Sequence, residues 1–437
     1  MTKESITFFW FRRDLRLEDN CGLYYALSNS ERVIPLFIFD TTILSKLEEP
    51  KDGRVEFIHL QIAALKEKLT KLGSDLLIET GDPIQVWEKL IREYKIKSVY
   101  VNKDYEPGAI NRDKRINELL NTHSAQLFLF KDQVIFEENE VSKFDGKNYT
   151  VFTPYYNSWF GKLKTDESAY LKNYNSSRYY SNFKKGIQSR MPSLQELGFQ
   201  KTGMSFPDSN FKIEIINRYK QKRDFPSLNS TSRLGIHLRF GTISIRKLVR
   251  LALNEELTFL KELVWREFYM QILWANPHLV DKCFRPKYEL IQWRNNEMEF
   301  ERWCKGMTGY PFVDAGMREL NETGFMHNRA RMITASFLTK HLLIDWRWGE
   351  AYFASKLLDF ELASNNGGWQ WAAGCGTDAA PYFRIFNPIT QQKKFDSDGK
   401  YVRKWIPELD SLQYPNPIVD HKFARERCLN TFKEALK

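Results

Sequence analysis

The sequence predicts two domains, an α/β domain built on a five-stranded parallel sheet and an all-α domain after it. Three observations support this prediction. The 437 residues exceed the length of one ordinary domain. Residues 1–130 alternate short apolar runs with amphipathic helical stretches, which is typical of a parallel sheet covered by helices. From Phe211 to Ala354 the chain instead carries apolar stripes at helical spacing, which indicates successive helices, so residues 208–437 are expected to form the second domain.

Each predicted strand is a short run rich in apolar and β-branched residues. The five runs are Ile6–Phe11, Val33–Phe39, Leu76–Glu79, Ser98–Val101 and Gln126–Phe130. Between them, Val55–Leu72 has apolar residues at helical spacing, and Pro83 stands where a helix begins, since that position needs no N–H. This order indicates a Rossmann-like sheet. It lacks a G-x-G-x-x-G or Walker loop, so a standard dinucleotide or triphosphate site is excluded by motif.

A long connector is expected between the two domains. Residues 131–207 are rich in Ser, Asn, Tyr, Lys and Pro and show little periodicity. In the helical domain that follows, Leu263, Phe268 and Ile272 alternate with polar positions, and Arg331–Leu343 carries another apolar stripe.

Composition narrows the class of partner. A net charge of +10 creates a field that attracts polyanions. Aromatic residues make up 15% of the chain, and such a surplus suits stacking on planar groups such as bases. Nucleic acid is therefore a candidate partner, although a basic protein can also be basic for solubility alone.

Cysteine spacing and hydropathy exclude several other classes of protein. The five cysteines are scattered and form no C-x-x-C pair, so neither a metal site nor a disulfide framework is indicated. The first residues are too short for a signal-peptide core, and no stretch approaches the ~18 apolar residues of a membrane span. We therefore expect a cytoplasmic protein without a membrane partner, and nothing indicates more than a monomer.

The segment Asp359–Trp371 is the most informative part of the chain, because acids, amides and indoles replace the usual aliphatic core. Gly367 and Gly368 let the backbone approach a flat ligand closely. Trp369 and Trp371 point in different directions, so each can meet a different ligand. The segment predicts the wall of a cofactor and substrate site. The alternative is a loop with two half-buried tryptophans.

Two charged segments each have a structural alternative. Arg12–Asn20 follows the first strand, where a loop of ion pairs is the ordinary interpretation. Residues 219–235 end in Thr231-Ser232-Arg233-Leu234-Gly235, whose hydroxyls and arginine suit phosphate oxygens. A Thr or Ser helix cap explains the second segment equally well.

Four residues of the helical domain share one helical face. They are Glu262, Trp265, Arg266 and Tyr269, at positions i, i+3, i+4 and i+7. On such a face an acid can accept hydrogen bonds from a base edge while the indole stacks on the base. The alternative is a core tryptophan flanked by surface ions.

Taken together, these motifs resemble the DNA photolyase and cryptochrome family. The resemblance covers nearly the whole chain and rests on Arg12–Asn20, Tyr219–Gly235, Glu262–Tyr269, Thr308–Arg318, Met326–Met332 and Asp359–Pro388. It implies a class I cyclobutane pyrimidine dimer photolyase. In such an enzyme, light-excited reduced FAD donates an electron to a flipped-out dimer in DNA, the ring splits, and the electron returns.

The resemblance implies one reduced FAD per chain. Asn365 matches the residue facing flavin N5, and an amide that cannot readily supply a proton suits a reduced, anionic flavin. Arg331 is expected to pair with Asp359 beside the flavin. Glu361 stands where many relatives have Asp, so its extra methylene puts the contact with flavin N3–H in doubt. The implied phosphate and ribose contacts are Tyr219, Thr231, Ser232, Arg233, Leu234 and Gly235.

The resemblance also implies the contacts to damaged DNA. Glu262 and Trp265 match residues that bind the dimer, and Trp371 matches a second stacking tryptophan. Photolyases specific for the (6-4) photoproduct carry histidines at the positions of Asn328 and Met332, so this chain points to cyclobutane dimers. The other implied lesion and DNA contacts are Arg223, Arg266, Tyr269, Asn328, Arg329, Met332, Arg384 and Gln391.

Trp369, Trp346 and Trp293 match the tryptophan chain that photoreduces the flavin in this family. Glu106 resembles a folate-binding acid, which leaves methenyltetrahydrofolate, a deazaflavin, a second flavin or no antenna as alternatives. His327 is expected to be structural rather than a general acid.

Two other functions compete with repair. The first is a cryptochrome-like blue-light photoreceptor, against which Asn365 and the short segment after Trp405 argue. The second is a non-enzymatic flavin- or nucleic-acid-binding protein, which should bind DNA with strong salt dependence and no preference for lesions.

Overall fold

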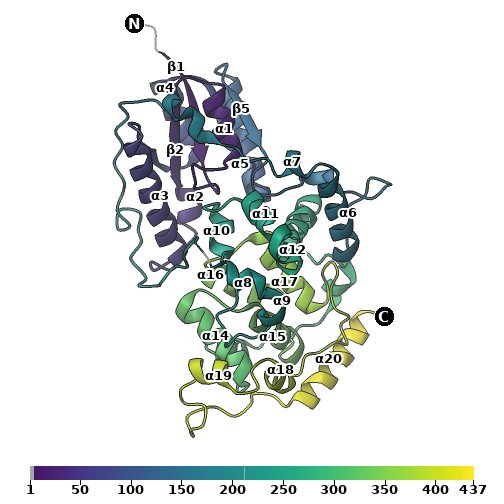
Figure 1. Ribbon diagram of the computed structural model, residues 1–437. Coiled ribbons are helices and arrows are strands. Elements are labelled where there is room, and N and C mark those ends of the chain that lie inside the picture. The colour runs from purple at the N-terminus through teal and green to yellow at the C-terminus, as the bar shows by residue number, and fades with distance from the viewer. Residues whose placement is uncertain (1–3, 211) are drawn as a thin grey trace. The chain divides into compact units, whose positions relative to one another are not determined.

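The computed structural model describes residues 4–210 and 212–437, which divide into two compact units (Figure 1). The first, called here the sheet unit, combines the described part of Met1–Glu140 with Gly161–Ser209 and Leu234–Asn254. The second, the helical unit, combines Val141–Phe160, Asn210–Arg233 and Glu255–Lys437. No helix within the described ranges combines the length and apolarity needed to cross a membrane.

The sheet unit contains the predicted five-stranded sheet, in which every neighbouring pair is parallel and the order is β3-β2-β1-β4-β5. At its centre, Phe8 is fully buried and pairs with Ile34 on one side and Val99 on the other. The strands are β1 (Ser5–Phe11), β2 (Val33–Asp40), β3 (Leu77–Gly81), β4 (Lys95–Asn102) and β5 (Gln126–Phe130). The predicted fold class is therefore confirmed for this part of the chain.

Helices connect and cover the strands of this sheet (Figure 1). Pro83 is the first residue of its helix, as the sequence predicts, and Asp82 caps that helix by accepting from the N–H of Ile84. The helical segments of the sheet unit are α1 (Cys21–Ser28), α2 (Thr41–Leu44), α3 (Gly53–Lys71), α4 (Pro83–Glu93), α5 (Pro107–Asn121), η1 (Glu138–Glu140), α7 (Glu167–Tyr170), η2 (Ser176–Asn182), α10 (Gly235–Phe240) and α11 (Ile245–Glu255).

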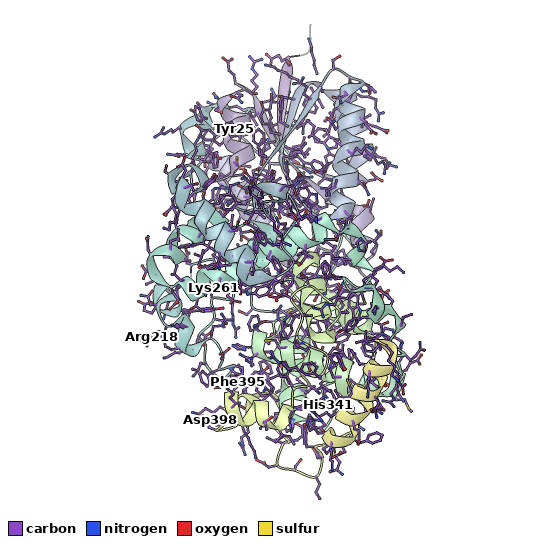
Figure 2. All side chains as sticks on the ribbon, turned by 90° about the vertical axis from the view of Figure 1, so that its right-hand side faces the viewer. Tyr25, Arg218, Lys261, His341, Phe395 and Asp398 are labelled. Atoms are coloured by element: carbon purple, nitrogen blue, oxygen red, sulfur yellow. The ribbon has the colours of Figure 1, made fainter. Side chains whose placement is uncertain are left out.

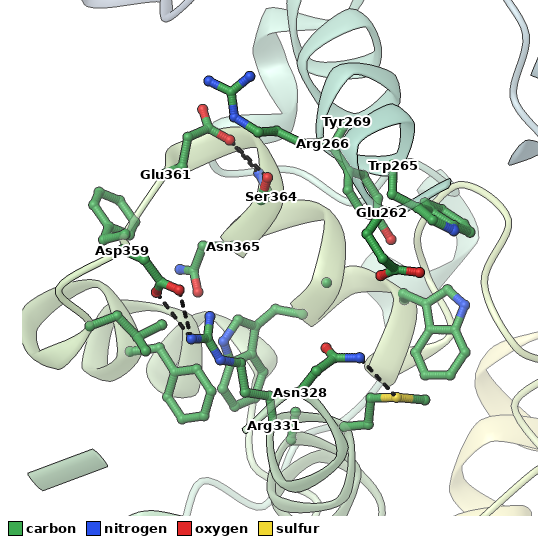
Figure 3. Close-up of a pocket in the computed structure, with 18 of the residues that line it drawn as sticks. Glu262, Trp265, Arg266, Tyr269, Asn328, Arg331, Asp359, Glu361, Ser364 and Asn365 are labelled. Atoms are coloured by element: carbon green, nitrogen blue, oxygen red, sulfur yellow. Dashed lines mark hydrogen bonds and ion pairs between the residues drawn. The ribbon is translucent and has the colours of Figure 1, made fainter. Parts of the chain in front are cut away.

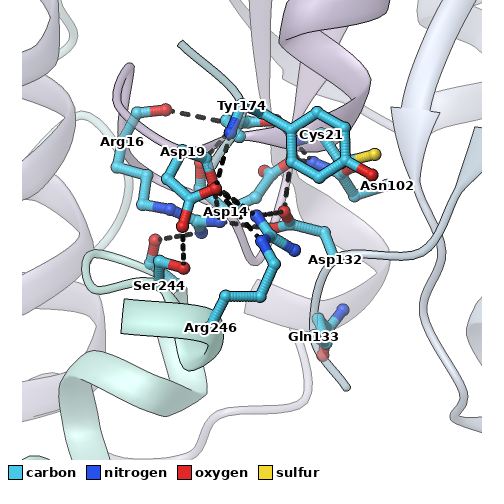
Figure 4. Close-up of polar contacts among 12 residues, drawn as sticks. Asp14, Arg16, Asp19, Cys21, Asn102, Asp132, Gln133, Tyr174, Ser244 and Arg246 are labelled. Carbon is cyan, nitrogen blue, oxygen red and sulfur yellow. Dashed lines mark hydrogen bonds and ion pairs between the residues drawn. The ribbon is translucent and has the colours of Figure 1, made fainter. Parts of the chain in front are cut away.

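A buried network of ion pairs explains why α11 belongs to the sheet unit (Figure 4). Arg246 of α11 donates to Asp132 at 2.8 Å and to Asp19 at 3.1 Å. Arg16 donates to the other oxygen of Asp132 at 2.6 Å, and Ser244 donates to Asp19 at 2.6 Å. The segment after the first strand is thus an ion-paired loop, as the structural alternative for Arg12–Asn20 proposed.

The carboxylate of Asp132 is the centre of this network. Burial disfavours its charge, but Arg16 and Arg246 hold the pKa of Asp132 below its ordinary value. The Asp132→Ala variant should lower the free energy of unfolding by about 3–5 kcal/mol, because two buried guanidinium groups lose their partner. Urea denaturation measures this loss.

A matched control is Asp398→Ala, which removes an exposed partner of Lys400. An exposed ion pair contributes about 0–1 kcal/mol, so this variant should unfold nearly as the parent does. Equal denaturation curves for the two variants would show that the buried network adds nothing to stability.

The expected connector is not a separate element of the fold. Within residues 131–207, helix α6 (Phe152–Thr165) forms, and the boundary between the two units falls inside it. Side chains of α6 account for its packing, because the phenol of Tyr155 and the indole of Trp159 both donate to buried Glu267 in the helical unit, at 3.4 and 2.6 Å. The helix could have been recognised from the sequence, because Phe152, Tyr155, Trp159 and Leu163 recur at helical spacing.

The helical unit consists of helices packed around one large apolar core, as the sequence predicts. Its helical segments are α8 (Ile213–Asn217), α9 (Tyr219–Lys222), α12 (Leu257–Ala275), η3 (Pro277–Val280), η4 (Pro286–Leu290), α13 (Glu297–Cys304), α14 (Pro311–Thr323), α15 (Asn328–Ser336), η5 (Phe337–His341), α16 (Trp346–Lys356), α17 (Leu362–Ala373), α18 (Pro388–Phe395), α19 (Lys400–Trp405) and α20 (His421–Ala435).

The predicted stripe Arg331–Leu343 is not one continuous α-helix. After α15, a π-helical turn, η5, places Phe337 and His341 in a stacked contact with ring centroids 4.8 Å apart. His341, labelled in Figure 2, lies 2.9 Å from His421 at the start of α20, measured between ring nitrogens. This turn therefore connects the core to the C-terminal helix.

Candidate functional site

A cavity of about 430 Å³ opens in the helical unit, between α12, α15 and α17 (Figure 3). Its size is in the range of pockets that bind small molecules. The residues of the sequence prediction that line it are Arg223, Glu262, Trp265, Arg266, Tyr269, Asn328, Arg331, Met332, Asp359, Glu361, Asn365, Trp369 and Trp371. Segments far apart in the sequence thus meet at one pocket.

Helix α12 forms one wall of the pocket. Glu262, Trp265, Arg266 and Tyr269 all line the cavity, because their spacing places them on one face of the helix. The opposite face contributes buried apolar residues such as Phe268 to the core. Packing of its apolar residues in the core therefore fixes the position of the polar face of α12.

An ion pair orients Glu262 on this wall of the pocket. Its carboxylate accepts from the guanidinium of Arg223 at 2.5 Å. Burial opposes the charge of Arg223, but Glu262 holds the pKa of that guanidinium above its ordinary value. Arg223 also lies over the ring of Tyr219, 5.1 Å from its centroid. The pair presents a fixed acid to whatever enters the pocket.

Helix α17 forms the facing wall, so the loop alternative for Asp359–Trp371 is wrong. A Cβ atom on Gly367 would lie 2.2 Å from the ring of Tyr269, so this glycine permits close packing of α17 on α12. A Cβ atom on Gly368 would meet nothing within 4 Å, and Gly368 lines the cavity. Only the second glycine therefore opens backbone toward a ligand.

Glu361 caps α17. Its carboxylate accepts from the backbone N–H and the hydroxyl of Ser364, both at 2.9 Å, and from the N–H of Ala363 at 3.4 Å. Glu361 is also 6% exposed and lines the cavity. The longer side chain thus has a structural role that the comparison of Glu with Asp did not suggest.

A salt bridge and an amide lie between these walls. Arg331 donates to both oxygens of Asp359, at 3.1 and 2.8 Å, and to the carbonyl of Met326 at 2.8 Å. Asn365 points into the same pocket (Figure 3), and its amide donates to the carbonyl of Glu350 at 3.1 Å. The pocket therefore offers a charged pair and a neutral amide to a polar ring edge.

Helix α15 provides the floor of the pocket on the Glu262 side. The amide of Asn328 lies 3.9 Å from the sulfur of Met332. Arg329 is turned to another partner, since it donates to Asp224 at 2.6 Å and lies over the ring of Phe395. Arg329 does not line the cavity, so its expected contact with DNA has to form outside it.

His327 is the N-cap of α15, where its ring nitrogen accepts from the N–H of Arg329 at 3.2 Å. Burial lowers the pKa of His327 to about 4. The ring is therefore neutral near pH 7 and caps the helix that carries Asn328 and Met332. This geometry fits a structural histidine.

Acid should destabilise the protein through His327. Between pH 6.5 and 4 the unfolded chain binds a proton that the folded ring does not, so the free energy of unfolding falls by up to about 1.4 kcal/mol per pH unit. His327→Asn keeps a good capping residue but removes the titration. Denaturation at pH 7, 5.5 and 4 should show a shallower loss for this variant, and parallel losses would contradict the assignment.

The three tryptophans of the predicted chain lie in the core of the helical unit. Trp369 lines the cavity and packs so tightly on Gly349 of α16 that a Cβ there would lie 2.1 Å from the indole. Trp346, the first residue of α16, is fully buried. Trp293 is half-buried and contacts Phe432 at a centroid distance of 6.0 Å. Exposure is therefore greatest at Trp293.

The structure leaves several predicted residues outside the pocket lining. The N-cap of α10 is Leu234, so the Thr or Ser cap alternative is wrong. Arg233 has a φ of 51° and lies over the ring of Phe325. The other predicted cofactor and DNA residues that do not line the cavity are Tyr219, Thr231, Ser232, Gly235, Arg384 and Gln391.

Sequence reasoning missed several lining residues. Ser364 is bound by the N-cap Glu361, but Glu is not among the preferred N-cap residues, so the spacing gave no signal. The aromatic and apolar lining residues Phe353, Leu357 and Phe360 had none, because apolar residues at helical spacing look the same in any core.

A second cavity, of about 590 Å³, lies in the sheet unit and contains Glu106. Glu106 accepts from Arg13 at 3.0 Å and from Arg239 at 2.6 Å. Trp10 lines the same cavity, and Arg112 stacks on its ring, 5.1 Å from the centroid. The candidate antenna acid is thus part of a basic and aromatic pocket within one unit.

The chain combines an α/β unit with a helical unit that contains a polar, aromatic pocket, and comparisons with known proteins show the class of protein to which this combination belongs. A family model described as "DNA photolyase" matches residues 7–172, and one described as "FAD binding domain of DNA photolyase" matches residues 259–413. The deoxyribodipyrimidine photo-lyase of Escherichia coli is 37% identical, with 98% of each chain covered.

Solved structures are similar over the same length. A bacterial class III photolyase from Agrobacterium tumefaciens has a TM-score of 0.88 and 33% identity, covering 100% of this chain and 98% of that one. An archaeal photolyase from Sulfolobus tokodaii, solved with two FAD molecules, has a TM-score of 0.83 and 34% identity, covering 98% and 100%. The chain belongs to the DNA photolyase and cryptochrome family, and its full-length similarity to relatives named deoxyribodipyrimidine photo-lyase supports enzymatic activity of the photolyase type.

The pocket fits the FAD of this family. Gly368 leaves open space at the wall, Trp369 and Phe353 supply flat apolar surface, and Arg331 and Asn365 supply polar groups. A flat heteroaromatic ring with polar edges matches this set of groups. The matched FAD-binding domain contains all of these residues.

Proposed function

We propose that the chain repairs cyclobutane pyrimidine dimers in DNA, driven by light. One observation carries the proposal: a single pocket contains both the Arg331–Asp359 pair with Asn365 and the Glu262–Trp265 face of α12. The first group suits a flavin, and the second suits a base lesion. A cofactor and a substrate bound there would lie close together, and a short distance favours transfer of an electron between them.

The flavin side of the pocket would hold reduced FAD. Arg331, Asp359 and Asn365 would bind the polar edge of its ring, and the amide of Asn365 does not itself readily supply a proton. When bound and excited by blue light, reduced FAD supplies the electron that splits the dimer. The phosphate and ribose contacts remain predictions and are Tyr219, Thr231, Ser232, Arg233, Leu234 and Gly235.

The lesion side would hold a flipped-out dimer. Glu262, oriented by Arg223, would accept hydrogen bonds from the base edges, and Trp265 and Trp371 would stack on the rings. Extrusion costs less for a damaged base, whose stacking is already weakened. Asn328 and Met332 would complete the slot, and the absence of histidine at both positions supports dimers over (6-4) photoproducts.

The remaining contacts would bind the DNA backbone. Arginine guanidinium groups suit phosphate oxygens through charged hydrogen bonds. The proposed residues are Arg266, Arg329, Arg384 and Gln391. A net charge of +10 supports this partner through long-range attraction.

We also propose a site for an antenna chromophore in the sheet unit. The cavity around Glu106 would hold a flat antenna chromophore, and the second FAD of the Sulfolobus tokodaii photolyase makes a flavin one candidate beside methenyltetrahydrofolate and a deazaflavin. Placement in class I rests on the sequence resemblance alone. The expected monomeric state and cytoplasmic location also stay predictions.

Lesion specificity tests the proposal. Reduced protein is illuminated with oligonucleotides that carry either one thymine dimer or one (6-4) photoproduct, in single- and double-stranded form. Repair of the dimer alone is the expected result. Repair of the (6-4) photoproduct alone would overturn the lesion assignment, and repair of neither by protein that holds FAD would favour the cryptochrome-like photoreceptor.

A further inference from the structure

Phe152 lies directly behind the tryptophan of the proposed lesion slot. Its ring is stacked on the indole of Trp265, with centroids 3.8 Å apart and planes 7° apart. Phe152 is 7% exposed and does not line the cavity, whereas Trp265 does. One face of the indole is therefore covered, and the cavity meets the rest of the ring.

Hydrogen bonds tie the backbone around Phe152 to the segment that follows α17. Its N–H donates to the carboxylate of Asp378 at 3.2 Å, and the hydroxyl of Thr377 donates to the carbonyl of Thr150 at 2.5 Å. Two side chains of α6 also bind one carboxylate of α12, since Tyr155 and Trp159 both donate to Glu267, and Trp159 does so at 2.6 Å. Phe152 therefore cannot shift without breaking contacts on two elements.

Other rings restrict the indole as well. Phe268 meets Trp265 edge-on at a centroid distance of 5.6 Å, and Tyr269 lies 5.4 Å away at a tilt of 33°. Both are neighbours on α12, so they contact the indole only near its own helix. Phe152, in contrast, belongs to α6, and its ring lies parallel to the indole of Trp265. Phe152 therefore fixes the plane of that indole.

We propose that Phe152 is a positioning residue that makes Trp265 a stacking surface with one free face, and thereby gives the pocket its preference for a fused pyrimidine dimer. The inference rests on the proposed function. A pre-set ring loses little freedom when a base stacks on it, whereas a free indole has to be ordered during binding. Undamaged DNA does not enter the slot, so a pre-set indole does not increase its affinity.

The experiment compares two changes at the same position. Phe152→Leu fills most of the space without a flat ring, and Phe152→Tyr keeps the ring. Binding of an oligonucleotide with one thymine dimer, and of the same oligonucleotide undamaged, is measured in darkness with FAD-loaded protein. Phe300→Leu is the matched control, because Phe300 is also stacked on a tryptophan, Trp303, at 5.8 Å, but lines no part of the pocket.

Phe152→Leu should weaken binding of the dimer roughly three- to tenfold, the loss expected for one aromatic pair, and leave binding of undamaged DNA unchanged. Phe152→Tyr and Phe300→Leu should keep the preference of the parent. The lesion concentration for half-maximal repair should rise for Phe152→Leu, while the rate at saturation stays near that of the parent. Phe152→Met replaces Phe152→Leu if that variant does not fold.

Three results overturn the inference. Phe152→Leu keeps the preference for the dimer, or it weakens both oligonucleotides equally, or Phe152→Tyr loses the preference as well. Failure of the proposed function looks different, because the parent protein itself would then show neither preference for the dimer nor light-dependent repair.

Discussion

The Glu262→Ala variant should bind a thymine dimer about 10- to 100-fold more weakly than the parent, because a hydrogen bond to a charged group contributes about 1.5–3 kcal/mol. The structure adds a second reason for the loss. Arg223 donates to Glu262 at 2.5 Å, so removal of the acid also leaves a half-buried guanidinium without this partner. Light-dependent repair at limiting substrate should fall in parallel, whereas the content of bound FAD should not change.

Two further variants separate the role of the acid from general damage. Glu262→Gln keeps an acceptor but weakens the attraction to Arg223, so its loss should be intermediate. Glu297→Ala removes an exposed acid in the first turn of α13, outside the pocket, and should repair like the parent. If Glu262→Ala repairs as well as the parent, the lesion does not bind at this wall.

The Trp293→Phe variant should not photoreduce oxidised FAD, yet it should repair normally when the flavin is reduced chemically beforehand. The three tryptophans run from the pocket wall at Trp369 through buried Trp346 to half-buried Trp293. Trp293 is the most exposed of the three, so an external reductant can donate an electron to the tryptophan chain there. Absorbance of the flavin under blue light measures the reduction.

Trp303→Phe is the matched control for this prediction. Trp303 is fully buried and lies 6.0 Å from Trp369, so it touches the same indole but offers no route to solvent by its own exposure. Its replacement should leave photoreduction intact. If Trp293→Phe photoreduces normally and Trp303→Phe does not, the electron reaches Trp369 through Trp303 and not through Trp293.

The features of the fold that local pattern controls were predictable from the sequence. Alternating apolar runs gave the strand positions, with Gln126–Phe130 matching in both bounds, and Pro83 marked the start of its helix. The face formed by Glu262 and Trp265 was likewise readable, because helical spacing alone decides it. Such features depend on residues close together in the chain.

The features that depend on distant residues were not predictable. Phe152 stacks on Trp265 across more than a hundred residues, and no periodic pattern relates the two. Arg246 of α11 joins the sheet unit through Asp132, which moves a segment expected in the helical domain into the other unit. The helix cap at Glu361 was missed for a different reason: it is local, but Glu is not a usual N-cap residue, so Glu361 was interpreted only as an altered flavin contact.

The most direct test of the account is a crystal structure of the protein with FAD and a DNA duplex that contains one thymine dimer. We expect the flavin ring beside Arg331, Asp359 and Asn365, and the dimer against Glu262 and Trp265 in the same cavity. A dimer bound elsewhere, or a flavin that fills the cavity as far as Trp265, would contradict the claim that one pocket brings cofactor and lesion into contact.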